Sequence, residues 1–162
     1  MSLTTMQAQD VFKKGTLLFN AGIGMPYTYG FIPTINISGE YGVIPTGDVG
    51  IVSFGGLFEM QFAQYDYWYG YSATVKPIFI LGPRASWHLQ TFKSEKWDVY
   101  GGVGFGILFK AQPYDNYYSS TISGYGEIFV GGRMMFSENF GLFAELGGGS
   151  RSFAKFGVAF GF

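Results

Sequence analysis

The dominant pattern of the chain is an alternation of large apolar residues with small or polar residues. In the last segment, 154–162, the even positions carry alanine, phenylalanine or valine, and the odd positions carry lysine, glycine or alanine. A period of two indicates a β-strand with two different faces. The same alternation recurs in seven earlier segments, which are 16–23, 31–41, 52–60, 71–88, 97–110, 127–136 and 140–147. The pattern predicts an all-β chain of eight strands.

The charged residues within these segments all fall on one face. They are Glu40, Glu59, Lys76, Arg84, Asp98, Lys110, Glu127, Arg133, Glu145 and Lys155. Each lies opposite the large apolar positions of its own strand. A lysine or arginine that faces lipid at the middle of a bilayer costs about 2–4 kcal/mol, which gives this sorting a physical cause. It predicts an eight-stranded antiparallel up-and-down transmembrane β-barrel with an apolar outside and a polar lumen.

A soluble barrel or sandwich is the alternative that the alternation leaves open. Its apolar face would point inward and its charges outward. The interior of an eight-stranded barrel is only just wide enough for side chains to fill. The many aromatic residues of the apolar face would not fit there, whereas glycines and charged residues would. We therefore favour the membrane interpretation.

Composition supports a membrane barrel and excludes several classes of function. Only 13% of the 162 residues are charged, 20% are aromatic and 26 are glycine, whereas soluble domains carry about 25% charged residues. The near-zero net charge argues against a nucleic-acid partner, and the absence of cysteine excludes disulfides and zinc–thiolate sites. The length fits one domain, residues 13–162. We interpret residues 1–12 as an N-terminal tail or expression remnant outside the barrel.

The expected connections alternate between two kinds. The segments 43–48, 90–96 and 137–139 are short and carry turn residues, whereas 25–30, 61–70, 111–124 and 147–152 include two long, tyrosine-rich stretches. Outer-membrane barrels have short periplasmic turns and longer external loops, so we expect both termini in the periplasm. The expected external loop surface comprises Tyr65, Tyr67, Trp68, Tyr69, Tyr114, Tyr117 and Tyr118. These side chains are typical both of an interfacial girdle and of a ligand-binding surface.

The C-terminal segment carries a family resemblance. With Phe156, Val158, Phe160 and the final Phe162 in alternation with small residues, the chain resembles the small outer-membrane β-barrels of Gram-negative bacteria, in the style of OmpX and the OmpA barrel domain. The resemblance implies that these four residues form the signal read by the barrel-assembly machinery. It also implies outer-membrane lipid as surroundings. We expect a monomer.

Candidate catalytic chemistry rests on one residue, His88. Ser86 lies on the same face and Asp98 lies close across a short turn, so a nucleophilic triad is conceivable. We interpret the group instead as a lumen His–Asp pair, because a lipid-modifying site belongs near the outer leaflet and His88 precedes a short turn. The glycine-rich stretch 101–106 does not open a helix, so it is not a dinucleotide-binding loop. We assign no catalytic, cofactor-binding or metal-binding residue.

The ten charged residues and His88 are expected to form an ion-pair network in the lumen. Folding each hairpin about its connection predicts four neighbouring pairs: Glu59 with Lys76, Lys110 with Glu127, Arg133 with Glu145, and His88 with Asp98. Unpaired charges in a narrow lumen cost several kcal/mol, so we expect no continuous pore.

The expected function is therefore that of a structural or surface-interaction barrel with a plugged lumen, and not of an enzyme. The alternative is a passage for small hydrophobic molecules through a gap in the wall. Pro33, Pro77 and Pro83 motivate it, because proline cannot donate to the strand ladder. A lipid-modifying enzyme is the third option and depends on His88.

Overall fold

The computed structural model describes residues 11–27, 32–65, 74–90, 94, 96–110 and 121–162. Eight strands account for most of these residues. They are β1 (Leu17–Pro26), β2 (Thr34–Pro45), β3 (Gly50–Tyr65), β4 (Thr74–Leu89), β5 (Trp97–Lys110), β6 (Thr121–Ser137), β7 (Phe140–Gly148) and β8 (Ser152–Gly161). The prediction of eight strands is confirmed. No helix within the described ranges is long and apolar enough to span a membrane.

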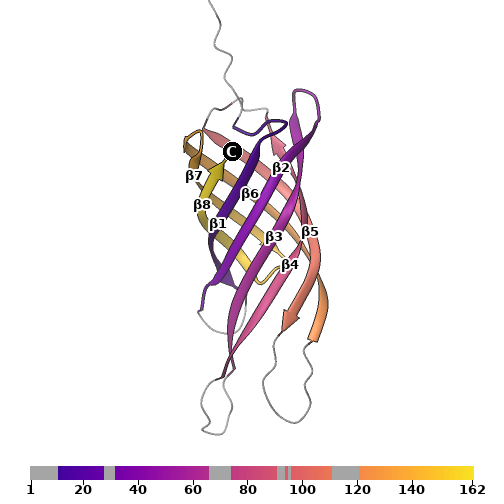
Figure 1. The fold of residues 1–162 in the computed structure, drawn as a ribbon, viewed down its shortest axis with the longest axis vertical. Helices are drawn as coiled ribbons and strands as arrows, with labels where there is room; N and C mark the ends of the chain where they lie inside the picture. The colour runs from indigo at the N-terminus through magenta and orange to yellow at the C-terminus, as the bar shows by residue number, and fades with distance from the viewer. Residues whose placement is uncertain (1–10, 28–31, 66–73, 91–93, 95, 111–120) are drawn as a thin grey trace, which may run out of the picture.

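The strands form a closed antiparallel barrel in sequence order (Figure 1). Each strand pairs with the next, and β1 closes the barrel against β8, with Ala21 opposite Val158. The predicted up-and-down barrel is therefore confirmed. The end of β8 and the start of β1 lie at the same end as the short β2–β3 connection (Figure 1). There Thr46 N donates to Gly50 O at 2.8 Å, and Gly47 has φ +72°, which a glycine adopts without strain.

The outer face carries the large apolar side chains, as the alternation predicts. Phe105 and Ile128, for example, are each 67% exposed. Exposed apolar residues on the predicted outer face occur on all eight strands, among them Phe19, Ile37, Phe54, Leu81, Val103, Val130, Leu142 and Phe156. In water such a surface would be far larger than the apolar patches of ordinary monomers. The outside of the barrel suits hydrocarbon surroundings.

The lumen contains the charged residues, but also apolar side chains that the alternation did not reveal. One apolar cluster lies at the end with the short turns and consists of Phe12, Leu18, Ile51, Met135, Phe143 and Ala159. A second, made of Ile78, Ile80 and Leu108, lies in the halves of β4 and β5 nearer the long connections. The polar network therefore lies between two apolar layers. This layering matters because it removes water from the charged groups.

Phe12 corrects the expected boundary of the barrel. The sequence interpretation placed it in a tail outside the fold, yet only 2% of its surface is exposed. Its carbonyl oxygen accepts a hydrogen bond from Gln90 Nε2 at 2.7 Å. The backbone of Lys13 also lies so close to Gly42 that a Cβ there would be 2.4 Å from Lys13 O. Residues 11–16 thus pack against the short-turn end of the barrel, and Phe12, which belongs to the apolar cluster inside that end, is named the Phe12 plug.

The three prolines lie before or within strands, and one of them coincides with a gap in a strand ladder. Pro33 precedes β2, while Pro77 and Pro83 lie within β4. The β4–β5 ladder pairs Leu81 with Ile107 and then resumes at Arg84 with Gly104, without bridges at Gly82 and Pro83. The two backbones nevertheless stay close, since a Cβ added at Gly82 would lie 2.1 Å from the carbonyl oxygen of the β5 residue Phe105.

Candidate functional site

Arg133 is the centre of the lumen network. It projects inward from β6, and none of its surface is exposed. Its Nη1 donates to Asp98 Oδ2 at 2.7 Å, and its Nη2 donates to Glu40 Oε1 at 3.0 Å. Its Nε donates to Asn20 Oδ1 at 3.0 Å, and the guanidinium lies 4.0 Å from the centre of the Tyr100 ring. One side chain therefore links β1, β2, β5 and β6 across the lumen.

His88 lies between two carboxylates. Its Nδ1 is 2.9 Å from Asp98 Oδ1, and its Nε2 is 3.0 Å from Glu40 Oε2. Only the imidazolium form supplies an N–H to both carboxylates at once. The Phe12 ring stacks on the imidazole with 3.7 Å between ring centroids and 12° between planes. The Phe12 plug therefore contacts the network directly.

Arg84 provides a second bridge across the lumen. Its Nη2 donates to Glu145 Oε1 at 3.0 Å, and its Nε lies 3.7 Å from Glu40 Oε1. Tyr100 Oη donates to the same Glu145 oxygen at 2.9 Å. The guanidinium also lies 3.7 Å from the centroid of the Phe129 ring. Arg84 and Arg133 share Glu40, so the two bridges form one network.

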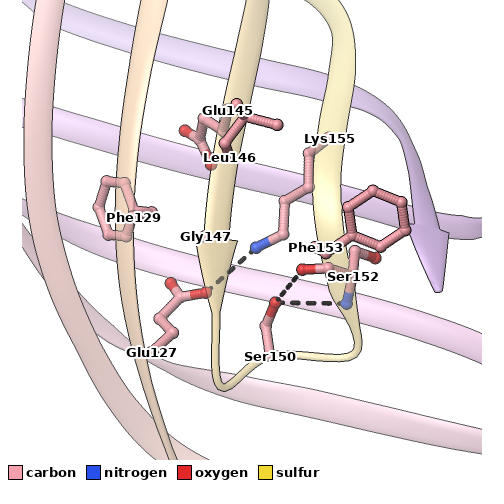
Figure 2. A pocket seen from close by; sticks show the side chains of 9 residues that line it. All are labelled: Glu127, Phe129, Glu145, Leu146, Gly147, Ser150, Ser152, Phe153 and Lys155. Atoms are coloured by element: carbon pink, nitrogen blue, oxygen red, sulfur yellow. Dashed lines mark hydrogen bonds and ion pairs between the residues drawn. The ribbon is translucent and has the colours of Figure 1, made fainter. Parts of the chain in front are cut away.

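A separate cluster lies nearer the β7–β8 turn. Figure 2 shows Lys155 reaching toward Glu127, with a distance of 3.1 Å from Nζ to Glu127 Oε2. Lys155 Nζ is also 3.6 Å from Glu59 Oε2, and Ser152 Oγ donates to Glu59 Oε1 at 2.5 Å. Among the described residues Glu127 Oε1 has no hydrogen-bond partner, and Glu127 lines a cavity of about 10 Å³. That volume is near the minimum for one water molecule.

Acidic groups outnumber basic groups among the buried residues that the structure describes. Five carboxylates (Glu40, Glu59, Asp98, Glu127 and Glu145) face three permanent cations (Arg84, Arg133 and Lys155). A protonated His88 narrows this difference. The two remaining predicted network residues, Lys76 and Lys110, are only partly buried and lie toward the long-connection ends of β4 and β5.

Two of the four residue pairs estimated by folding the hairpins are wrong. The register places Glu59 opposite Ile80 and Lys76 opposite Ala63, so the predicted pairing of Glu59 with Lys76 is wrong. The predicted pairing of Lys110 with Glu127 is also wrong, because Lys110 lies opposite Thr121 and Glu127 lies opposite Gly104. Both errors concern hairpins with long connections, where the centre of the loop is a poor guide to register. Both acids instead contact Lys155.

The two pairs estimated across the short turns agree better with the structure. Arg133 lies opposite Phe143, which makes Glu145 its diagonal neighbour as predicted, although the hydrogen bonds of Arg133 go to other residues. His88 lies opposite Tyr100 rather than Asp98. The predicted contact between the His88 and Asp98 side chains nevertheless forms across that diagonal step.

A serine, His88 and Asp98 do come together, but in a form that disfavours nucleophilic catalysis. The serine is Ser53 rather than the predicted Ser86, and its Oγ lies 3.0 Å from His88 Nε2. A general base must accept the serine proton at that nitrogen, whereas here Nε2 also faces Glu40 Oε2. The Ser53 hydroxyl donates to the same Glu40 oxygen at 3.1 Å and is fully buried. The group acts as part of the polar network.

Sequence reasoning missed several members of this network. Asn20, Ser53, Tyr100 and Ser152 are uncharged, so the sorting of charges did not mark them, although all four lie at lumen-facing positions. The predicted loop residues Tyr67, Trp68, Tyr69, Tyr114, Tyr117 and Tyr118 lie outside the described residues. Tyr65 ends β3. Of the predicted assembly residues, Phe156, Phe160 and Phe162 are exposed on the outer face and Val158 is half-buried.

Comparison with known proteins shows which solved structures share this fold. No protein-family model matches the chain, and no curated protein matches its sequence. Among solved structures, the N-terminal β-barrel domain of Pseudomonas aeruginosa OprF matches with a TM-score of 0.61 and 16% identity, over 92% of this chain and 98% of that one. Ail, the attachment invasion locus protein of Yersinia pestis, matches at a TM-score of 0.41 and 11% identity, over 90% of this chain and 92% of its own. The closed barrel and the OprF match together identify the fold as that of the small eight-stranded outer-membrane β-barrels.

Proposed function

We propose that this protein is a structural or surface-interaction barrel of a Gram-negative outer membrane, with a lumen closed by ion pairs. The network centred on Arg133 and Arg84 carries the proposal. Its groups are buried and joined across the lumen by hydrogen bonds of 2.7–3.0 Å. Such a lumen joins the walls of the barrel and leaves little room for a column of water.

The outer surface supports a membrane location. Large apolar side chains face outward on every strand, and the charges face inward. The alternative of a soluble barrel would expose this apolar surface to water. In the proposed arrangement the short turns and both termini face the periplasm, and the long connections face outward, where they meet partners of the cell surface.

Conductance tests the closed lumen. The protein inserted into planar bilayers should give no steady ionic current, because the network and the Phe12 plug block the lumen. The double variant Arg84→Ala/Glu145→Ala removes one cross-lumen bridge and should raise the current. The lipid-facing variant Val103→Ala should behave like the wild type. Steady conductance of the wild-type barrel would contradict a plugged lumen.

Labelling of single cysteines tests the location and the orientation, since the chain has no cysteine of its own. Asp48→Cys places a thiol in the short β2–β3 turn, and Ser123→Cys places one near the long-connection end of β6. Both positions are exposed. On intact cells a membrane-impermeant maleimide should label Ser123→Cys and leave Asp48→Cys unlabelled until the outer membrane is opened. The reverse pattern would invert the proposed orientation.

Passage of small hydrophobic molecules is the second candidate, and the gap in the β4–β5 ladder at Gly82 and Pro83 motivates it. The close approach of Gly82 to the β5 backbone counts against an opening there. A disulfide across this seam, made in the double variant Leu81→Cys/Ile107→Cys, would abolish such transport. If uptake of a hydrophobic dye through the barrel is unaffected by the disulfide, the seam is not the route.

A further inference from the structure

Two glycines on the outer face have no local reason to be glycine. A Cβ added at Gly101 would meet its nearest atoms at 3.5 Å, and one added at Gly132 would meet only Asp98 O at 3.8 Å. Both distances are ordinary van der Waals contacts, and neither residue has a positive φ. Glycine within a strand weakens it, because it adds chain entropy to the unfolded state and packs no side chain. Gly126 on the same face is equally open, so what distinguishes Gly101 and Gly132 is that they are diagonal neighbours across β5 and β6.

The two glycines form the floor of a groove across β4 to β7. The register sets Trp87, Gly101, Val130 and Leu146 in one row across the four strands. It sets Leu89, Val99, Gly132 and Ala144 in the adjacent row. Larger side chains thus stand around a floor of glycine and alanine. The resulting groove has a volume of about 510 Å³, within the range of small-molecule sites.

The lining determines which kind of molecule the groove suits. Its outward-facing side chains are aliphatic apart from the Trp87 indole, and Tyr100, which also lines it, has its side chain buried in the lumen. The Trp87 Nε1 donates to Thr46 Oγ1 in the β2–β3 turn at 3.0 Å, which holds the indole at the short-turn end. Tryptophan at such a position is typical of the membrane–water interface. The groove therefore runs from interface depth into the apolar belt.

We propose that this groove binds one acyl chain of a phospholipid from the leaflet on the short-turn side. The inference depends on the membrane location proposed above. A straight hydrocarbon chain that starts at the interface matches the groove in both polarity and direction. A second copy of the barrel fits less well, because a stable protein interface buries about 800 Å² on each partner and two convex barrel walls meet along a narrow strip.

Photo-crosslinking in lipid vesicles tests the proposal. The probe is a phosphatidylglycerol with a diazirine on one acyl chain, mixed into unlabelled phospholipid vesicles that hold the folded full-length chain. Adducts should be enriched on Trp87, Val99, Val130 and Leu146 relative to the outer-face residues around Gly126. Gly132→Leu fills the groove and should abolish that enrichment.

Gly126→Leu is the matched control. Gly126 lies on the same face of the same strand, with equally open space of 3.8 Å to its nearest atom, but it does not line the groove. It should leave the adduct pattern unchanged. If Gly132→Leu fails to fold, Gly101→Val takes its place, and the wild-type adduct map stands by itself.

Three results would overturn the proposal: adducts spread evenly around the barrel, enrichment that survives Gly132→Leu, or crosslinks between two copies at the groove. A wrong membrane location would give a different result. The wild-type chain would then not fold into the vesicles, and its gel mobility would not change on heating.

Discussion

Replacing Arg133 with methionine tests whether the lumen network stabilises the barrel as the geometry requires. Methionine keeps much of the side-chain length and packing but removes the guanidinium. The change leaves Glu40 and Asp98 without their shortest contacts to a permanent cation, at 3.0 Å and 2.7 Å. His88 then remains against both carboxylates, and Arg84 Nε remains 3.7 Å from Glu40 Oε1.

The expected loss follows from the contacts that are removed. Each of the two hydrogen bonds to a carboxylate contributes about 1.5–3 kcal/mol to stability. Breaking one partner out of a buried ion pair costs about 3–5 kcal/mol, because the other charge stays buried. We therefore expect Arg133→Met to lower the free energy of unfolding by about 3–5 kcal/mol. The exposed Lys14 offers a control, since Lys14→Met removes the same formal charge and should change stability by less than about 0.5 kcal/mol.

Equilibrium urea unfolding in lipid vesicles, followed by tryptophan fluorescence and the heat-dependent gel shift, measures these differences. The triple variant Arg133→Met/Glu40→Gln/Asp98→Asn removes the stranded charges together with the cation. It should recover much of the loss, because a whole buried ionic set is often replaceable at little cost. A loss below about 1 kcal/mol for Arg133→Met, the value of an exposed pair, would refute the network as a stabilising element. So would a triple variant less stable than the single one.

Three further predictions concern the C-terminal phenylalanine, the Phe12 plug and the β4–β5 wall. Phe162→Asp should reduce outer-membrane levels in cells more than it slows refolding in detergent, because the terminal aromatic is 75% exposed and little packing depends on it; unchanged levels would contradict a role in assembly. Phe12→Ala should lower the free energy of unfolding in urea by about 3–5 kcal/mol, as for a buried phenylalanine. It should also expose the His88 ring to water in NMR exchange experiments. An unaltered stability would show that Phe12 does not belong to the fold. Gly82→Ala should destabilise the barrel by about 1–3 kcal/mol, because its Cβ would lie 2.1 Å from a backbone carbonyl of β5. Gly56→Ala is its control, since the nearest atom lies 3.6 Å away, and equal effects of the two changes would show that the close approach is not the cause.

The sequence alone determined the number of strands, the assignment of the two faces and the order of the barrel. The reason is local: side chains on a strand alternate between the faces, and lipid penalises charge strongly enough to leave a clear pattern. The same pattern identified the eight charged residues that the structure buries in the lumen. The β6–β7 register was also estimated correctly from the short connection at Glu138 and Asn139, although the ladder itself shifts by one residue between Met135 and Ser137.

Only the tertiary structure decided which charges meet. Arg84 contacts Glu145 and Arg133 contacts Glu40, although 61 and 93 residues separate them in the chain. These contacts depend on the stagger of the strands around the closed barrel, which no single hairpin reveals. In addition, the β3–β4 and β5–β6 registers differ from those estimated from the centres of their long connections. Phe12 was invisible for a related reason. A single aromatic residue before the first strand has no alternation to mark it, and its position follows only from the cavity that the finished barrel provides.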